Sequence, residues 1–329
     1  MIRGLVEVAK ARAMKGALRL AARRVKIDHE VASRLKVPPH WDRGAVTVLV
    51  IGVDTRSRLR RRYKTIPQGE LVGSSADSIL VVVVDAPSNA IRVITVPRSL
   101  GVELPDLGYQ RLGWARQYGG SSSLVTAVAA ALGIDIHHYI ELGFRAFAGL
   151  VDAIGGVEFD VPAPIRDWRA GVDLSEGYQR LDGPAALGLV RSRQHTVESG
   201  GHMESRNIGE DGRSRNVAEM THALAVQMSR AVNPTIAARI ALKTIRDISV
   251  DPILAGRDWL PLVNMIRVMD FEFHSLPVSP LIPASELRSP FPPFQSSGSQ
   301  YLQLAQPQAI NLLQSLSPLS KEARDGPTH

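Results

Sequence analysis

Two apolar runs separated by a short gap constrain the fold most strongly. Residues 78–85 and 91–96 consist mainly of Val, Ile and Leu, and only Ala86-Pro87-Ser88-Asn89-Ala90 lies between them. Uninterrupted β-branched runs of this length predict strands that are buried on both faces. A connection this short joins antiparallel neighbours, because a parallel crossover needs about a dozen residues. The sheet is therefore not expected to be all-parallel.

Further periodic segments surround this hairpin. A third buried strand is expected over residues 46–53, followed by a basic loop. Capping residues and apolar periodicity predict the other elements. The expected helices are 121–132, 144–154, 183–190, 211–230, 235–245 and 254–268, and the expected strands are 138–142, 157–161 and 271–276. Helices that alternate with a sheet of mixed direction predict an α/β fold, a three-layer α/β/α sandwich around a central mixed β-sheet.

Composition divides the chain into three parts. The segment Pro38-Pro39-His40-Trp41-Asp42-Arg43-Gly44 interrupts regular structure and ends a basic amphipathic leader over residues 1–40. The main domain is expected over residues 46–285. Residues 286–329 form a Pro/Ser/Gln-rich tail in which only 308–316 is expected to be helical.

The positive charge belongs to the leader. The formal net charge is +7, and residues 1–36 alone hold ten Lys or Arg against three acidic residues. A helix over residues 2–27 would place Arg12, Lys15, Arg19, Arg23 and Lys26 on one face. Residues 1–27 would then suit an anionic membrane surface, although a solvated leader fits equally well. The sequence shows no run of about 20 apolar residues and no export signal, and without cysteine it has no thiol chemistry.

Charged residues stand where the apolar runs end. Asp54 follows the strand 46–53, Asp77 precedes the next strand, and Arg98 follows the strand 91–96. In an antiparallel hairpin the start of one strand and the end of the other lie at the same edge, so these three side chains are expected to meet. Arg191 and Arg193 follow the helix 183–190. Arginines that converge with carboxylates can hold a pyrophosphate and its metal ion.

Eight segments in order carry a resemblance to a known family. They are 49–56, Ala76-Asp77-Ser78-Ile79, Val96-Pro97-Arg98, Tyr118-Gly119-Gly120, His138-Tyr139-Ile140-Glu141, 147–157, 181–187 and Val190-Arg191-Ser192-Arg193. With these segments the chain resembles the LytR-CpsA-Psr family over residues 46–285. Members of that family are bacterial enzymes that move polyprenyl-pyrophosphate-linked glycans onto cell-wall polymers.

The resemblance implies a phosphotransferase that takes a glycan phosphate from a polyprenyl-pyrophosphate-linked glycan to peptidoglycan or a related acceptor. A pyrophosphatase side activity is also implied. Asp54 and Asp77 would hold Mg²⁺ or Mn²⁺ and act in catalysis with Arg98. The residues implied in pyrophosphate binding are Arg56, Arg98, Arg191, Arg193, Arg215 and Asn216. The family implies a membrane-associated, cell-wall-facing protein, while a chain without a spanning segment leaves a cytoplasmic or peripheral location open.

Three departures from the family pattern keep other functions open. Ser99 stands where the family usually has Asp after Pro-Arg, and Arg111-Leu112-Gly113 replaces a Lys-Ile-Asn-like segment. The late motif is compressed in 211–216, where Arg215 and Asn216 fit its last positions better than Arg213 does. A non-catalytic protein that binds polyprenyl-pyrophosphate glycans is one alternative. A transcriptional attenuator-type regulator is another, but no helix-turn-helix or aromatic-basic pattern is present, so no specific nucleic acid is expected.

Overall fold

The computed structural model describes residues 25–41, 43–54, 74–105, 107–199, 202–231, 233–256, 265–280, 302–304 and 308–316. The chain divides into two compact units. We call Asp28–Glu141, Val250–Leu254 and Glu272–His329 the sheet unit. We call Met1–Ile27, Leu142–Ser249 and Ala255–Phe271 the pocket unit. The single domain expected over residues 46–285 therefore contains parts of both units.

A seven-stranded sheet runs through the fold. Its order is β1 (Lys26–Ile27), β14 (Ile248–Val250), β7 (His138–Gly143), β2 (Ala45–Val53), β3 (Ala76–Asp85), β4 (Ala90–Val96) and β15 (Asp270–Ser275). The β2–β3 and β3–β4 pairs are antiparallel, and the registers pair Val53 with Ala76 and Ile79 with Val96. The predicted hairpin is confirmed. The end of β2, the start of β3 and the end of β4 therefore lie next to one another at the same end of the strands, which we call the sheet edge.

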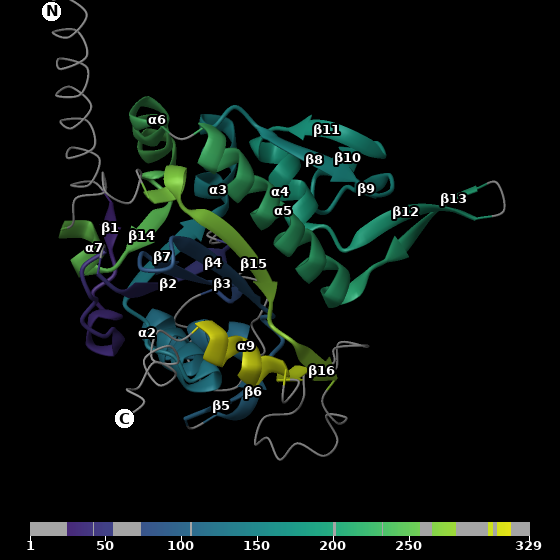
Figure 1. The fold of residues 1–329 in the computed structure, drawn as a ribbon. Coiled ribbons are helices and arrows are strands. Elements are labelled where there is room, and N and C mark those ends of the chain that lie inside the picture. Colours follow the sequence, from purple (N-terminus) through teal and green to yellow (C-terminus); the bar gives the residue numbers. More distant parts are fainter. Residues whose placement is uncertain are drawn as a thin grey trace, which may run out of the picture. The chain divides into compact units, whose positions relative to one another are not determined.

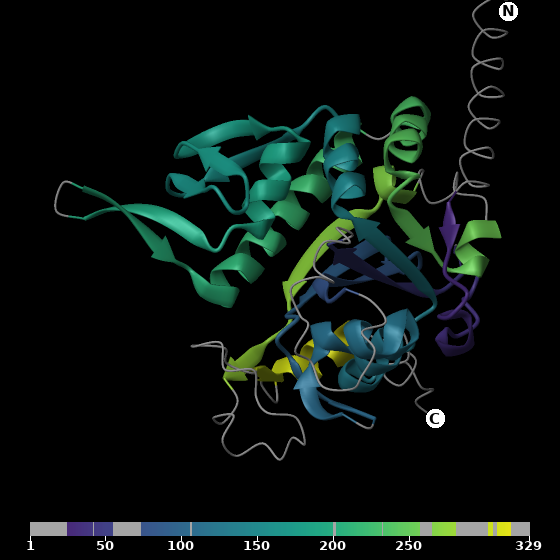
Figure 2. The same cartoon turned by 180° about the vertical axis from the view of Figure 1, so that it is seen from behind.

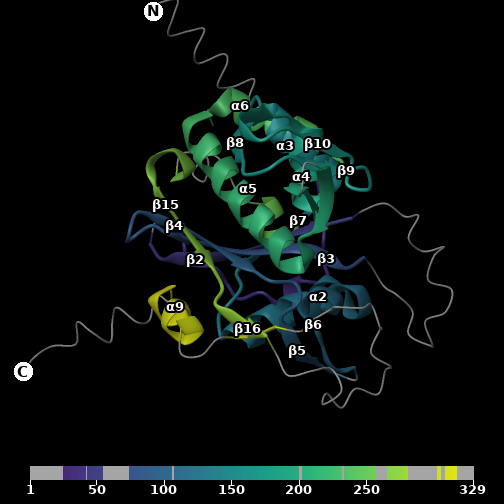
Figure 3. The ribbon, with the colours of Figure 1, turned by 90° about the vertical axis from the view of Figure 1, so that its right-hand side faces the viewer.

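The sheet unit buries one face of these strands under helices. Its other elements are η1 (Ala32–Arg34), β5 (Gly101–Leu104), β6 (Gly108–Arg111), α2 (Leu112–Leu132), β16 (Val278–Pro280), β17 (Leu302–Leu304) and α9 (Gln308–Leu316). Helices α2 and α9 lie on the same side of β2 and β3 (Figures 1 and 3). Leu49, Ile51, Val81 and Leu124 are fully buried in one cluster. Burial of these side chains holds α2 against the strands.

Helix α2 is longer than the predicted helix 121–132 and is broken at two glycines. Gly119 (φ −125°, ψ 16°) and Gly120 (φ 70°, ψ −171°) leave the helical conformation. The positive φ of Gly120 is open to glycine at no steric cost. The turns before the break are helical because Leu112 and Ala115 are buried in the core. The predicted start at residue 121 therefore marks the second segment of α2.

Part of the predicted leader belongs to the fold. Strand β1 joins the central sheet, and Val31 is completely buried in the core. The N–H of Lys36 donates to the carbonyl of Ile136 at 2.9 Å. Several residues between 26 and 36 therefore pair or pack with the fold although their composition groups them with the leader, and the boundary at residue 40 stays a prediction. The amphipathic helix expected over residues 2–27 lies almost wholly outside the described residues.

Part of the predicted tail also packs on the sheet unit. Strand β17 pairs with β16, and α9 covers the residues that the sequence predicts as helical. Ala309 is completely buried, and Leu312 and Leu313 pack against the core. The tail is therefore a structural part of the fold where it is described.

Short hairpins and helices build the described part of the pocket unit. Its elements are α3 (Phe144–Ala153), β8 (Val157–Val161), β9 (Ile165–Asp167), β10 (Val172–Leu174), β11 (Gly177–Leu181), α4 (Gly183–Arg191), β12 (Gln194–Ser199), β13 (His202–Asn207), α5 (Gly209–Ala231) and α6 (Pro234–Thr244). Phe159, Leu181, Leu189 and Met220 share its core. The β12–β13 hairpin extends away from α4 and α5 (Figures 1 and 2). Of the predicted helix 254–268, α7 (Pro252–Gly256) covers the start, and residues 257–264 are not described.

Candidate functional site

An ion pair marks the sheet edge where the sequence places its carboxylates. The Nη1 atom of Arg98 lies 2.8 Å from Oδ1 of Asp77, and the two side chains are 20% and 23% exposed. Asp54 directly follows Val53, which is paired with Ala76. The strand registers thus bring the three predicted residues to one edge, where a ligand can reach the Asp77–Arg98 pair.

The backbone around Arg98 is held by the first turn of α2. The N–H of Gly113 donates to the Arg98 carbonyl at 2.9 Å, and the Ser75 hydroxyl donates to the Gly113 carbonyl at 3.0 Å. A Cβ atom on Gly113 would lie 2.8 Å from the Ala76 carbonyl oxygen and 3.1 Å from the Arg98 Cβ. Gly113 therefore allows α2 to approach both the start of β3 and the Arg98 turn closely.

Two departures from the family pattern lie in this same region. Ser99 is buried, with 4% of its surface exposed, in the turn where the Leu100 N–H donates to the Pro97 carbonyl. Gly113 occupies the position of the family's amide, and the space around its Cα admits no longer side chain without a shift. Two small residues, Ser99 and Gly113, thus lie next to the Asp77–Arg98 pair at positions where the resemblance implies a carboxylate and an amide.

A second, more deeply buried ion pair lies nearby in the sheet unit. Arg116 binds Glu141 through Nε and Nη2 at 3.0 and 2.8 Å, and its Nη1 donates to the carbonyl of Ser74 at 2.7 Å. The Tyr139 hydroxyl donates to Glu141 at 2.8 Å. Burial and the adjacent Glu141 charge raise the pKa of Tyr139 well above its ordinary value. Sequence reasoning missed this network, although Glu141 lies in a segment that carries the family resemblance.

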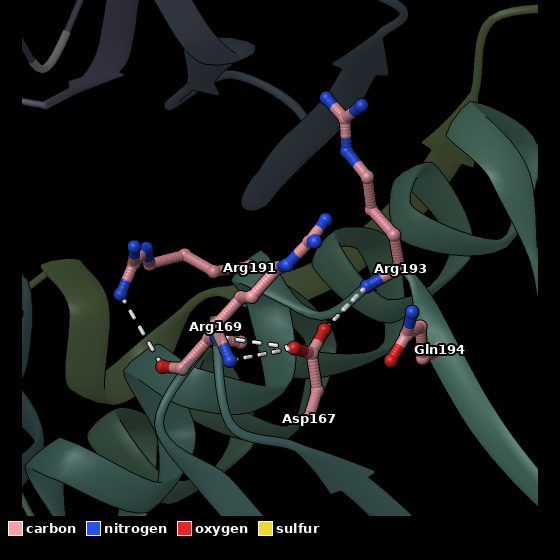
Figure 4. Close-up of a pocket in the computed structure, with 6 residues that line it drawn as sticks. Asp167, Arg169, Arg191, Arg193 and Gln194 are labelled. Atoms are coloured by element: carbon pink, nitrogen blue, oxygen red, sulfur yellow. Dashed lines mark hydrogen bonds between the residues drawn. The ribbon is translucent and has the colours of Figure 1, made fainter. Parts of the chain in front are cut away.

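In the pocket unit, two predicted arginines line a pocket. The pocket has a volume of about 370 Å³ and is lined by Asp167, Arg169, Ala170, Arg191, Arg193 and Gln194 (Figure 4). Arg191 Nη1 donates to the Ala170 carbonyl at 3.3 Å, and its guanidinium lies over the Phe144 ring at 4.8 Å from the centroid. Three arginines therefore contribute to the lining of one cavity, which suits an anionic ligand.

Asp167 joins the two walls of this pocket. Its carboxylate accepts the N–H groups of Arg169, Ala170 and Arg193 at 3.0, 3.1 and 3.3 Å (Figure 4). It also accepts the Ser192 hydroxyl at 3.1 Å. Burial alone would raise the pKa of Asp167, but these donors outweigh it and hold the pKa below the ordinary value of 3.8. No motif in the sequence marks this residue, because its partners come from a separate strand turn and helix end.

Two residues of the late motif, Arg213 and Asn216, stabilise the C-terminal turn of α4. Arg213 and Asn216 are 6% and 4% exposed, and their side chains donate to the carbonyls of Val190 and Leu189, both at 3.3 Å. These are among the last carbonyls of α4, and the Leu189 carbonyl also accepts the N–H of Ser192 at 3.2 Å. Arg215 is exposed. Pyrophosphate binding by Arg215 and Asn216 stays a prediction, and Arg56 lies outside the described residues.

The two sets of charged residues belong to different units. Asp54, Asp77 and Arg98 lie in the sheet unit, and the two arginines Arg191 and Arg193 lie in the pocket unit. The structure brings the predicted residues together within each unit. That the two sets share one pocket stays a prediction.

The carboxylates at the sheet edge suit a magnesium ion in their chemistry. Mg²⁺ is commonly held by one or two carboxylates and completed by water and substrate phosphates. Asp54 and Asp77 supply such oxygens at one edge. Among the described residues, no group of three or more His, Asp or Glu side chains could form a metal cage of its own. The donor set therefore fits an ion that a phosphate ligand completes, and binding of Mg²⁺ or Mn²⁺ stays a prediction.

Comparison with solved structures defines the fold. A LytR-Csp2A-Psr enzyme from Actinomyces oris superposes with a TM-score of 0.63 at 23% identity, over 90% of this chain and 98% of that one. TagT bound to LI-WTA superposes with a TM-score of 0.59 at 19% identity, over 89% and 97%. At such identities the likeness concerns the fold. It confirms the predicted α/β sandwich around a mixed central sheet.

Sequence comparison then identifies the family. The model of the LytR_cpsA_psr family matches residues 11–231, and the chain belongs to this family. The probable cell wall biosynthesis protein LcpB of Corynebacterium glutamicum is 33% identical over 146 residues, 44% of this chain and 35% of that protein. The polyisoprenyl-teichoic acid–peptidoglycan teichoic acid transferase TagT of Bacillus subtilis is 28% identical over 155 residues, 45% of each. The chain spans less than half the length of these two relatives.

Proposed function

We propose that this protein transfers a glycan phosphate from a polyprenyl-pyrophosphate carrier to peptidoglycan or a related cell-wall acceptor. The Asp77–Arg98 pair is the observation that carries the proposal, because it places a carboxylate and a guanidinium 2.8 Å apart at a partly exposed sheet edge. Family membership and a relative named as a teichoic acid transferase support the same reaction. A protein that faces the cell wall from the membrane fits this activity. Among the described residues, no helix is long and apolar enough to cross a membrane.

The proposed chemistry needs charge neutralisation and positioning more than covalent catalysis. An acceptor hydroxyl attacks the phosphorus next to the glycan, a new P–O bond forms, and the phosphoanhydride bond breaks to release polyprenyl phosphate. Arg98, Arg191 and Arg193 would grip the pyrophosphate oxygens, since a guanidinium fork matches them bidentately. Asp54 or Asp77 would accept the hydroxyl proton. When bound at these carboxylates, Mg²⁺ would supply further neutralisation of the phosphate charge.

Incubation with a defined lipid tests this reaction. The protein, Mg²⁺ and a polyprenyl-pyrophosphate-linked saccharide are mixed with peptidoglycan, and polyprenyl phosphate and peptidoglycan-bound saccharide phosphate are measured. We expect the wild type to form both products. Asp77→Asn should form both of them much more slowly. Arg166→Ala is the matched control, because Arg166 forms an exposed surface pair with Asp173. In the absence of acceptor, slow release of polyprenyl phosphate would reveal the pyrophosphatase side reaction.

A binding protein without turnover is the second candidate. The buried Ser99 favours it, because the family's usual carboxylate is missing beside Arg98. Tight binding of the lipid with no product in the assay above would support this candidate and contradict the transferase.

A further inference from the structure

A large aromatic side chain is exposed beside the arginine pocket. Trp168 is 83% exposed, in the turn between β9 and β10. Its sequence neighbours Asp167 and Arg169 both line the pocket. An exposed tryptophan leaves much apolar surface in water, and next to a ligand cavity that surface is available to contact a ligand.

The turn that carries Trp168 is fixed. The Asp167 carboxylate accepts the N–H groups of Arg169 and Ala170, and the Asp167 carbonyl accepts the Gly171 N–H at 2.8 Å. These hydrogen bonds join the residue before Trp168 to the three residues after it. The backbone below the indole is therefore ordered before any ligand arrives, which lowers the entropy cost of using the ring as a contact surface.

The indole also adjoins a cation of the pocket. The guanidinium carbon of Arg169 lies 5.2 Å from the Trp168 ring centroid, within the range of a cation–π contact. Arg169 lines the pocket together with Arg191 and Arg193. Arg169 thus connects the flat apolar face of the indole to the arginines of the pocket.

We propose that Trp168 binds the pyranose ring that follows the pyrophosphate of the carrier, with Arg169 at the junction between sugar and phosphate. This inference rests on the proposed function. A glycan pyrophosphate presents an anion next to a ring with one C–H face, and that face packs on an indole. The arginine pocket and the adjoining indole match these two parts in order.

The surroundings of Trp168 favour a sugar over a lipid chain. The neighbouring Arg166 and Asp173 side chains form an ion pair and are 70% and 75% exposed. An acyl or prenyl chain would need continuous apolar surface, which these charged side chains interrupt, whereas a sugar ring needs only the single face of the indole.

Binding of two carriers that differ only in the sugar tests the inference. One is a short-chain polyprenyl pyrophosphate with a single N-acetylglucosamine, and the other is the same polyprenyl pyrophosphate without sugar. Their Kd values are measured by calorimetry for the wild type, Trp168→Ala and Trp168→Phe. Trp168→Ala should weaken the sugar-bearing lipid by about three- to tenfold and leave the sugar-free lipid unchanged. Trp168→Phe should lie between the wild type and Trp168→Ala.

Tyr178→Ala provides the matched control, because Tyr178 is another exposed aromatic of the pocket unit, at 73%, and neither it nor its sequence neighbours line the pocket. It should alter neither Kd. Equal weakening of both lipids by Trp168→Ala, or no weakening of either, would overturn the sugar contact. If the wild type binds neither lipid, the proposed function fails and the inference falls with it.

Discussion

Arg98 holds Asp77 through a 2.8 Å contact between Nη1 and Oδ1, and neither side chain is fully buried. The pair therefore fixes the orientation of both groups while leaving part of each accessible. A pyrophosphate that arrives at this edge would meet an arginine already oriented by a carboxylate. Preorganisation of this kind removes reorganisation cost at the moment of reaction.

Arg98→Ala should lower transfer strongly with a small effect on folding. Loss of one oriented cation at a developing phosphate charge typically costs about 10²- to 10³-fold in rate. Arg98→Lys should recover part of the rate, because it keeps the charge but loses the planar fork. Rates are measured by polyprenyl phosphate release, and folding by the unfolding temperature. Wild-type rates in Arg98→Ala would contradict the assigned role.

Gly113→Ala should impair transfer more than its size suggests. The new Cβ would lie 2.8 Å from the Ala76 carbonyl oxygen, so the start of β3 or the Arg98 turn must shift. Misplacement of catalytic groups by about 1 Å can cost on the order of 10²-fold. Gly113→Asn, which restores the family's amide, should be no better. Gly256→Ala is the control, since no atom lies within 4 Å of its added Cβ, and retention of full activity by Gly113→Ala would refute the close-approach argument.

Arg116 and Glu141 should be strongly coupled in stability. Their side chains are 13% and 10% exposed, and Arg116→Met would leave the buried Glu141 charge without its cation. Breaking such a pair from one side typically costs about 3–5 kcal/mol. In a urea double-mutant cycle, Arg116→Met with Glu141→Gln should cost less than the sum of the single changes. The exposed Arg166–Asp173 pair should show coupling below about 1 kcal/mol, and equal coupling in both pairs would contradict this prediction.

The strands of the sheet unit follow from local sequence. Three apolar runs predict strands by themselves, namely 46–53, 78–85 and 91–96. The gap after Asp85 is short, so the antiparallel pairing can be predicted without knowledge of contacts that are distant in the sequence. The meeting of Asp77 with Arg98 follows from that register. In the pocket unit, β8 was predicted as the strand 157–161, whereas β9 and β10 were missed because runs of three residues carry too little periodicity to stand out.

The supporting contacts of the site depend on tertiary structure. Asp167 is recognisable only when the β9–β10 turn and the end of α4 are placed together, since its donors Ala170 and Arg193 are far apart in the chain. Arg116 meets Glu141 across 25 positions in the same way. Charged residues at strand ends can be predicted from sequence, whereas the buried groups that position them cannot.

Asp167→Asn should loosen the arginine pocket and change the acid stability. An amide cannot accept on both sides, so the Arg193 N–H would lose its acceptor at a cost of about 1–3 kcal/mol. Because the folded pKa of Asp167 is lowered, the carboxylate stabilises the fold above its ordinary pKa of 3.8. That contribution is lost as the pH falls from about 5 through the lowered pKa.

Urea unfolding midpoints between pH 7 and pH 2 measure this effect. The wild type should lose stability on acidification, and Asp167→Asn should lose less over the same interval. Some acid dependence should remain, because the pKa values of Asp85 and Asp251 are also lowered despite burial, by their hydrogen-bond partners. Parallel curves for the wild type and Asp167→Asn would show that Asp167 does not titrate in this way.

Asp54→Asn and Asp77→Asn should each weaken Mg²⁺ binding in the presence of a phosphate ligand. Each change removes an anionic oxygen donor, and Mg²⁺ prefers carboxylate and phosphate oxygens over amides at such sites. With inorganic pyrophosphate present, saturating Mg²⁺ at about 100 times its Kd would stabilise the wild type by about 2.7 kcal/mol. The unfolding temperature is followed while Mg²⁺ and then EDTA are added. It should rise and then fall in the wild type and change less in both variants.

Asp173→Asn is the control, because Asp173 is an exposed carboxylate in a surface ion pair. An undiminished Mg²⁺ response in both Asp54→Asn and Asp77→Asn would place the metal elsewhere and leave Asp77 with the single role of orienting Arg98.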